Sequence, residues 1–115
     1  MKQAGPGGQL QIFKAEFFRA LAHPVRIRIL EILSVGERSV QELQDTLQLD
    51  QPLVSQQLAV LRGKNIVVAQ KLGTTVKYAV RDPLVGELLK TARLIFENQL
   101  SGTQTMLREL RKERR

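Results

Sequence analysis

The chain of 115 residues has no cysteine and no tryptophan, a single histidine, His23, and an aromatic content of only 4%. Without cysteine it can form no disulfide bond, no thiolate zinc site and no cysteine nucleophile. One histidine cannot supply a histidine-rich metal cluster, no triad is assigned to His23, and the glycines form no phosphate-binding motif. Paired carboxylates in a catalytic arrangement are also missing. The sequence therefore predicts a protein that is not an enzyme and that holds no cofactor or metal ion.

Long hydrophobic runs are missing too. The longest stretches without a charged residue, 3–13 and 51–61, each span 11 residues and are too short for a transmembrane helix. Lys2 is not followed by the apolar segment of a signal peptide. We therefore expect residues 1–8 to form a short flexible tail, and the protein to stay in the cytoplasm without contacting a membrane.

Acidic residues are the minority, with 11 carboxylates against 18 lysine and arginine residues and a net charge of +7. Residues 51–81 contain five basic residues and no acidic one, so this window alone supplies +5. Such a concentration of positive charge favours a polyanionic partner. Residues 108–115 are also basic, but Glu109 and Glu113 dilute the charge at helical spacing, which is typical of a solvated helix end.

Apolar residues in 9–22 recur at three- and four-residue steps and predict an amphipathic helix. Pro24 ends this helix and opens a second one, which places His23 at the boundary, where its ring can bond the backbone. Gly36 is expected to terminate the second helix as a left-handed cap. Ser39 and Glu42 form a capping box that opens a third helix, reaching about residue 47.

A fourth helix is expected from Asp50, after a connection of about three residues. Its apolar residues repeat at i, i+4 and i+7, and a projection at about 100° per residue leaves the opposite face polar and uncharged. Glutamine can donate to and accept from the major-groove edge of adenine, and a small alanine allows close approach. An ordinary solvated helix face is the alternative. The inward residues are Val54, Leu58 and Leu61; Pro52, Gln56 and Ala59 lie opposite, and Gln51, Ser55 and Gln57 lie on the flanks.

After this helix the spacing of the apolar residues changes from a helical to a strand-like period. Residues 66–80 alternate in a β-rich pattern around Gly73 and predict a hairpin. Asp82 and Pro83 then open a last helix whose period continues to the end of the chain. Together with the first helix it carries more apolar surface than one small core can cover, which indicates a homodimer. The residues expected at this interface are Leu10, Phe13, Phe17, Leu88, Ile95 and Leu100.

Three segments, 22–30, 51–62 and the hairpin ending in Lys77-Tyr78, resemble the ArsR/SmtB family of bacterial transcriptional repressors in order and spacing. The resemblance covers about residues 10–100. It implies a mainly α fold with a small β-hairpin, a winged helix-turn-helix that forms a homodimer through its first and last helices. On this basis residues 9–100 form the DNA-binding domain, and 101–115 form a basic extension of the last helix.

The resemblance also implies which residues contact DNA, with the fourth helix in the major groove and its end and the hairpin on phosphates. The family usually has arginines around the hairpin glycine, where Lys71 and Thr74 stand here, and a merely solvated hairpin is the alternative. Tyr78 is expected to pack beneath the hairpin, and a platform on which a base stacks is the alternative. The DNA-binding candidates are Gln51, Pro52, Ser55, Gln56, Gln57, Arg62, Lys64, Lys71, Thr74, Thr75 and Lys77.

Many members of this family sense metals, but the sensing residues do not carry over. The positions of the usual cysteine pair are occupied by Ser39 and Gln41, and the last helix has glutamates but no histidine. We expect zinc, nickel and cobalt to bind weakly at best. A signal would then come from a small molecule, a regulatory partner protein or the protein's own concentration.

Together these observations predict a sequence-specific transcriptional regulator, a repressor, that binds double-stranded DNA at a pseudo-palindromic operator as a dimer. The alternative is a winged-helix interaction or architectural module that acts through a partner protein and has weak operator specificity.

Overall fold

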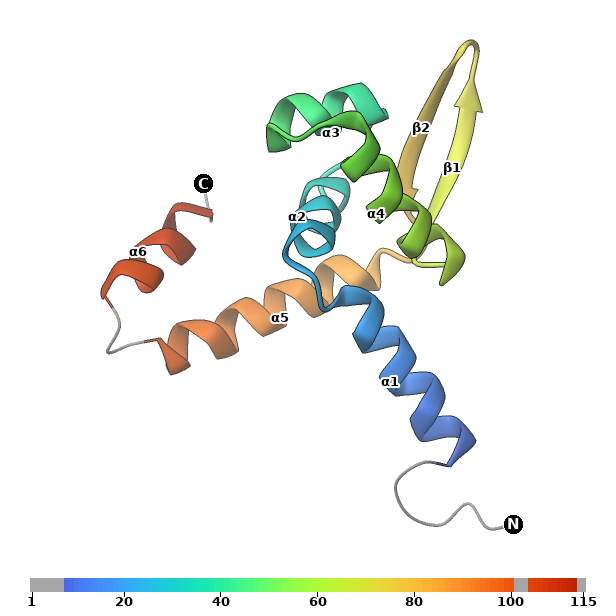
Figure 1. The fold of residues 1–115 in the computed structure, drawn as a ribbon. Coiled ribbons are helices and arrows are strands. Elements are labelled where there is room, and N and C mark those ends of the chain that lie inside the picture. Colours follow the sequence, from blue (N-terminus) through green and yellow to red (C-terminus); the bar gives the residue numbers. More distant parts are fainter. Residues whose placement is uncertain (1–7, 101–103, 114–115) are drawn as a thin grey trace. The chain divides into compact units, whose positions relative to one another are not determined.

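The computed structural model describes residues 8–100 and 104–113, and the chain divides into two units, Met1–Asp82 and Pro83–Arg115 (Figure 1). The first unit contains four helices and a hairpin, and the second contains two helices. Within the described residues, no helix is both long enough and apolar enough to cross a membrane. The elements are α1 (Gln9–Leu21), α2 (Pro24–Leu33), α3 (Val40–Leu47), α4 (Gln51–Gly63), β1 (Val67–Leu72), β2 (Thr75–Val80), α5 (Leu84–Gln99) and α6 (Gln104–Glu113).

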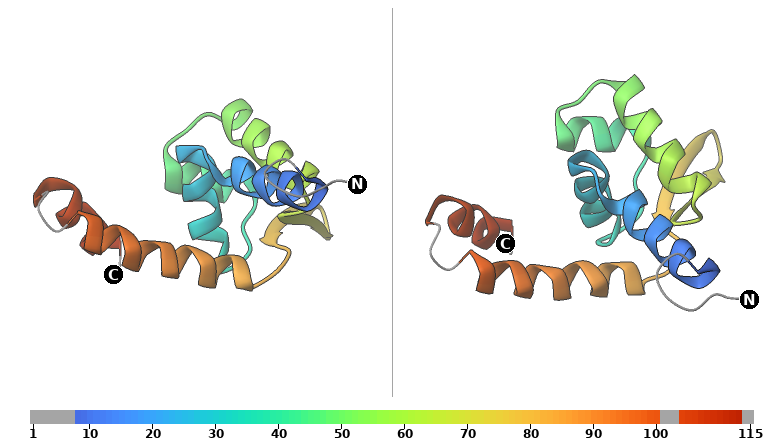
Figure 2. Two further views of the ribbon diagram at one scale, coloured as in Figure 1. Left: turned by 90° about the horizontal axis from the view of Figure 1, so that it is seen from below. Right: turned by 60° about the horizontal axis from the view of Figure 1, so that its bottom comes forward.

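The core of the first unit forms where α2, α3 and α4 meet the hairpin. α4 packs against α3, α2 and β1, as the two views in Figure 2 also show. The apolar stripes expected for these helices face this core. Leu30, which was expected only to support the main stripe of α2, is fully buried. The helix that carries the candidate DNA-reading face is therefore fixed on its inner side. The buried hydrophobic residues of this unit are Ala20, Leu21, Ile29, Leu30, Leu33, Leu43, Leu47, Val54, Leu58, Leu61, Ile66 and Val67.

The starts of α2 and α3 confirm two predictions of capping. The Nδ1 atom of His23 accepts a hydrogen bond from the backbone amide of Val25 at 3.1 Å. Ser39 Oγ accepts from the amide of Glu42 at 3.1 Å, and Glu42 Oε1 accepts from the amide of Ser39 at 2.8 Å, which completes the capping box. Asp50 is the N-cap of α4, as expected, but its side chain makes no capping hydrogen bond.

The prediction of a left-handed cap at Gly36 is wrong. α2 already ends at Leu33, and Ser34 follows in the right-handed conformation, with its hydroxyl donating to the carbonyl of Leu30 at 2.7 Å. The left-handed positions outside glycine are Gln48, which caps α3, and Asn65, just after α4. The end of α2 is thus capped by the hydroxyl of Ser34, which bonds a carbonyl there, and not by Gly36.

The hairpin follows its prediction closely. β1 and β2 pair antiparallel, from Val67 opposite Val80 to Leu72 opposite Thr75. The two-residue turn has Gly73 at φ 66°, a conformation that costs glycine little. On the other side of β2, Arg38 and Tyr78 exchange two backbone hydrogen bonds of 3.0 and 2.7 Å. The middle of β2 is therefore held by backbone on both edges.

The second unit corrects the expectation of one continuous last helix. α5 ends at Gln99, and α6 is a separate helix that contacts it. Arg93 Nη1 donates to the carbonyl of Leu110 at 2.7 Å, whereas in one straight helix residues 17 apart would be separated by roughly 25 Å. The sequence Ser101-Gly102 lies outside the described residues, but both residues, glycine most of all, have lower helix propensity than alanine.

Two other boundaries complete the comparison with the sequence. Pro83 is the N-cap and α5 begins at Leu84, one residue later than the expected start with Asp82 as the cap. Residues 1–7 of the expected tail lie outside the described residues, and Gly8 is the N-cap of α1.

Candidate nucleic-acid interface

α4 presents one face to the core and a different one to solvent. Val54, Leu58 and Leu61 are buried, as the projection required, and Gln56 and Ala59 are exposed on the opposite side. No hydrogen bond joins the Gln56 amide to any residue in the part of the chain that the structure describes. Its donor and its acceptor are therefore both available to a base edge.

The projection was wrong about Gln57. This residue is only 7% exposed, and its Oε1 accepts a hydrogen bond from Arg26 Nη1 at 2.8 Å. The packed side of α4 is wider than the apolar stripe because α2 covers this flank as well. Gln57 thus belongs to the support of α4, and it is no longer a candidate for contact with DNA.

Two polar residues and a proline line the start of α4 on its open side. Gln51 and Pro52 are exposed and Ser55 is half-buried. Gln51 Nε2 donates to Ser55 Oγ at 2.6 Å, one helical turn away. This hydrogen bond leaves the hydroxyl proton of Ser55 and the side-chain Oε1 atom of Gln51 free to bond another polar group.

The cations expected on phosphates differ in their present partners. Lys64 Nζ lies 3.4 Å from Glu16 Oε1, and Lys77 Nζ lies 2.9 Å from Glu42 Oε1. Hydrogen bonds from the backbone amide of Ser39 and from Lys77 lower the pKa of Glu42 from its ordinary 4.5 to about 2. The hydrogen bond from Lys64, followed by the charge of Arg19, lowers the pKa of Glu16 as well.

Among the four cations expected on phosphates, Arg62 and Lys71 are the two without such a partner. Neither side chain forms an ion pair or hydrogen bond with any of the described residues. Arg62 lies in the last turn of α4, and Lys71 lies near the end of β1, close to the exposed Thr74 of the turn and Thr75 at the start of β2. Arg62 on α4 and Lys71 on the hairpin therefore both have hydrogen-bond donors that are free to bind a phosphate.

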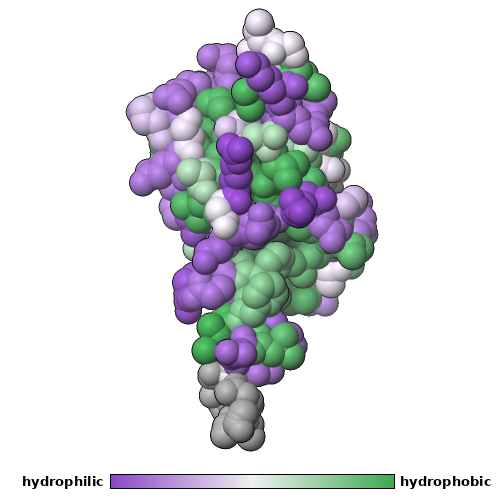
Figure 3. All heavy atoms as spheres, turned by 90° about the vertical axis from the view of Figure 1, so that its right-hand side faces the viewer, coloured by the Kyte–Doolittle hydropathy of each residue, from purple (hydrophilic) through white to green (hydrophobic). Residues whose placement is uncertain are grey.

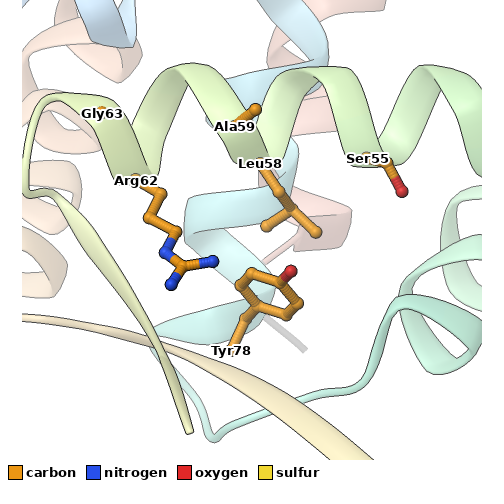
Figure 4. Close-up of a pocket in the computed structure, with 6 residues that line it drawn as sticks. All are labelled: Ser55, Leu58, Ala59, Arg62, Gly63 and Tyr78. Atoms are coloured by element: carbon orange, nitrogen blue, oxygen red, sulfur yellow. The ribbon is translucent and has the colours of Figure 1, made fainter.

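A cleft of about 440 Å³ lies between α4 and β2 (Figure 4). Sequence reasoning missed it, because it placed Tyr78 beneath the hairpin as a packing residue. The ring is half-buried and faces the cleft. The one available signal was that the chain's single tyrosine falls inside the window without carboxylates. The cleft is lined by Ser55, Leu58, Ala59, Arg62, Gly63 and Tyr78.

The expected dimer residues include several exposed apolar side chains. On α1, Leu10 is 59% and Phe13 71% exposed, whereas Phe17 is half-buried against the ring of Phe18. Figure 3 shows this apolar surface over α1. On α5, Ile95 is exposed and Leu88 and Leu100 are half-buried. Ile12 and Phe18 add to the α1 face.

Ser39 and Gln41 occupy the positions of the family's usual cysteine pair, and both side chains form hydrogen bonds within the chain. Ser39 caps α3, and Gln41 Nε2 donates to Asp45 Oδ1 at 3.0 Å. Among residues 8–100 and 104–113, no group of three or more histidine, aspartate or glutamate side chains could hold a metal ion. The donor set at this place fits no transition metal that prefers soft ligands.

Comparison with known proteins places this arrangement in a family. The model for bacterial regulatory proteins of the arsR family matches residues 23–68, from the start of α2 into β1. The chain is 44% identical to the Mycobacterium tuberculosis HTH-type transcriptional regulator Rv0081 over 99 residues. This aligned region covers 85% of this chain and 87% of the relative. The crystal structure of Rv0081 matches with a TM-score of 0.75 over 82% of this chain and 95% of that chain.

Two further relatives have informative descriptions. A probable mercury resistance operon repressor of Streptomyces lividans is 38% identical over 81 residues, 70% of this chain and 65% of that protein. The winged helix-turn-helix DNA-binding domain of Mb0332 from Mycobacterium bovis, described as homodimeric, matches with a TM-score of 0.74 at 25% identity, over 88% of this chain and 96% of that chain. Fold, sequence and helix-hairpin geometry agree: this chain is a winged helix-turn-helix transcriptional regulator of the ArsR/SmtB family, which is not a family of enzymes.

Proposed function

We propose that this regulator is a sequence-specific repressor that binds a pseudo-palindromic operator as a homodimer. The observation that carries the proposal is the open face of α4, where Gln56 is exposed and unpartnered beside Gln51 and Ser55. This face is uncharged and slim, and it sits on a helix whose other side is buried. A rigid helix with amide groups on its free side suits the donor and acceptor pattern of the major groove.

The dimer follows from the apolar side chains of α1 and α5. Phe13, at 71% exposure, has the largest exposed fraction among the large hydrophobic residues of α1. Contiguous apolar surface of this kind is usually covered by a partner. The homodimeric description of the Mb0332 domain supports the same assembly here. A twofold axis then requires half-sites about one helical turn apart, roughly 10 bp or a small multiple of it.

The cations around α4 and the hairpin would bind phosphates on either side of the groove. Arg62 and Lys71 are free to do so, and Lys64 and Lys77 would exchange a carboxylate for a phosphate. Exposed ion pairs contribute only about 0–1 kcal/mol, so this exchange costs little. Thr74 and Thr75 at the turn can add hydroxyl contacts. Bound in this way on chromosomal DNA in the cytoplasm, the dimer would repress by competing with RNA polymerase.

The test is footprinting on the DNA just upstream of the protein's own gene, followed by binding curves on the protected site and on random duplex at several salt concentrations. We expect one symmetric protected site and specific binding about 10³-fold or more tighter than random binding. Steep salt dependence without sequence preference would favour an architectural role instead. Weak binding to both duplexes, with capture of a defined partner protein, would favour the interaction module.

A further inference from the structure

The cleft between α4 and β2 collects three hydrogen-bond donors from two elements. Ser55 and Arg62 come from α4, and Tyr78 comes from the opposite wall. Figure 4 shows the Arg62 guanidinium and the Tyr78 ring both extending into the space between the helix and the strand, with the Leu58 side chain between the helix and the ring. No carboxylate lines the cleft. Its donors and its charge therefore suit an anion.

Two of these donors are unused within the chain. Neither the guanidinium of Arg62 nor the hydroxyl of Tyr78 makes a hydrogen bond to any residue within the described ranges. The planar guanidinium of Arg62 has no carboxylate in the cleft, so its donors are available to a phosphate, and the Tyr78 hydroxyl can add one more. The ring of Tyr78 and the side chain of Leu58 exclude water from one side, which strengthens such a contact.

The backbone of Tyr78 is fixed more firmly than the rest of the hairpin. It pairs with Ala69 of β1 on one side and with Arg38 on the other. α4 is fixed in turn by its buried face. The two walls of the cleft are therefore both positioned before any ligand arrives, which lowers the entropic cost of binding.

The geometry of duplex DNA identifies the anion. When α4 lies in a major groove, a phosphodiester backbone borders the groove on either side of the helix, and one of these backbones is on the side of the hairpin. The opening between α4 and β2 is where a strand would pass. A phosphate there would face Arg62, Ser55 and Tyr78 together.

We propose that this cleft is a phosphate seat, in which Tyr78 Oη and the Arg62 guanidinium bind one phosphate of the DNA strand that passes between α4 and the hairpin. This inference rests on the proposed function for the placement of α4. It assigns to Tyr78 a direct contact with DNA, and it makes the junction of helix and hairpin a fixed point that sets the depth of α4 in the groove. The contact is independent of base sequence.

The test uses the full chain and a short duplex of random sequence, so it needs no operator. Tyr78→Phe removes a single oxygen and keeps the ring on Leu58, and we expect the Kd to rise about tenfold with no change in salt slope, since the hydroxyl is neutral. Arg62→Ala should raise the Kd by about tenfold or more and reduce the salt slope by about one. Arg28→Ala, which removes an exposed guanidinium from α2, is the matched control and should shift the Kd less than about twofold.

The combined variant adds a check on shared binding. If both groups bind one phosphate, Tyr78→Phe should have little further effect once Arg62 is alanine. A Kd for Tyr78→Phe within about twofold of the wild type, in a variant with unchanged unfolding, overturns the seat. The proposal is also overturned if Tyr78→Phe raises the Kd as much in the Arg62→Ala variant as it does in the wild type.

A second measurement needs no Tyr78 variant. On an operator found by footprinting, single phosphates are replaced by neutral methylphosphonates, and the wild type is compared with Arg62→Ala. One position should weaken the wild type strongly and Arg62→Ala hardly at all; if no position does so, the proposal fails. Inorganic phosphate at millimolar concentration should not displace DNA, and competition there would overturn the DNA strand as occupant in favour of a free anion. Absence of sequence preference would contradict only the proposed function, because the random-duplex results decide the seat.

Discussion

Arg26 Nη1 donates to Gln57 Oε1 at 2.8 Å and so joins α2 to the covered flank of α4. The same guanidinium donates through Nε to the carbonyl of Ala20 at 2.6 Å. One side chain thus connects the end of α1, the start of α2 and the middle of α4. Gln57 looks like a DNA-reading residue in the sequence, but in the structure it is buried and its side chain holds α4 against α2.

Loss of Arg26 should destabilise the fold. Arg26→Ala leaves the buried Gln57 oxygen without a donor, and we expect the free energy of unfolding to fall by about 2 kcal/mol in urea titrations. Arg26→Lys should not restore it, because one ammonium group cannot reproduce the fixed fork that reaches two acceptors. Arg28→Ala, on the exposed side of the same helix, should change stability by less than about 0.5 kcal/mol. Equal losses for Arg26→Ala and Arg28→Ala would contradict this role.

Gln56 should determine specificity. Gln56→Ala should weaken operator binding by about 1–3 kcal/mol and leave binding to random duplex nearly unchanged, because a base-edge contact is lost and no charge is removed. Lys71→Ala should weaken both and lower the salt slope. Gln11→Ala on the exposed side of α1 is the control for losing a surface glutamine. If operator discrimination survives Gln56→Ala, the orientation assigned to α4 is wrong.

Phe13 should be needed for the dimer but not for the fold of the subunit. We expect Phe13→Glu to shift sedimentation at micromolar concentration from dimer to monomer and to weaken operator binding, since a charge would be buried at the apolar interface. Its helical circular dichroism should stay close to that of the wild type, because the side chain is 71% exposed within the chain. Val35→Glu changes an even more exposed apolar residue, 82% exposed and outside the expected interface, and should remain dimeric.

Glu42 should make stability depend on acid pH. Its folded pKa of about 2 lies below its ordinary 4.5, so the folded state binds the proton less readily than the unfolded state. The contribution of the charged form is therefore complete above pH 4.5 and is lost as the pH falls toward about 2. The stability difference between the wild type and Glu42→Gln, followed by thermal unfolding, should shrink across this interval. Glu37→Gln, an exposed substitution outside the capping box, is the control; a pH-independent difference for Glu42→Gln would refute the argument.

Two glycines beside the candidate interface should respond in opposite directions to the same substitution. Gly63 ends α4, and an added Cβ there would meet nothing within 4 Å, so Gly63→Ala should stabilise the protein by about 0.5–1 kcal/mol. Gly73 has φ 66°, so Gly73→Ala should destabilise it by about 1–2 kcal/mol. Chemical denaturation of both variants provides the comparison. Loss of stability in Gly63→Ala would show that the end of α4 needs a glycine backbone.

Elements with local causes could be predicted from the sequence. The capping box of Ser39 and Glu42, the break at Pro24 and the hairpin around Gly73 depend on residues a few positions apart, so their patterns could be read directly. The inward stripe of α4 and its exposed opposite face also followed from helical period alone. Those features were enough for the fold and for the exposure of Gln56 on the open face of α4.

Only the tertiary structure decided which polar residues near that face are free. Gln56 and Gln57 are neighbours of the same type, and they differ because α2 brings Arg26, 31 residues away, against one of them. Lys77 meets Glu42 from 35 residues away, and Tyr78 faces Arg62 across a cleft that neither segment forms alone. The break between α5 and α6 is likewise fixed by a contact from Arg93 to Leu110. Such contacts depend on how elements pack across long stretches of chain, and no local period encodes them.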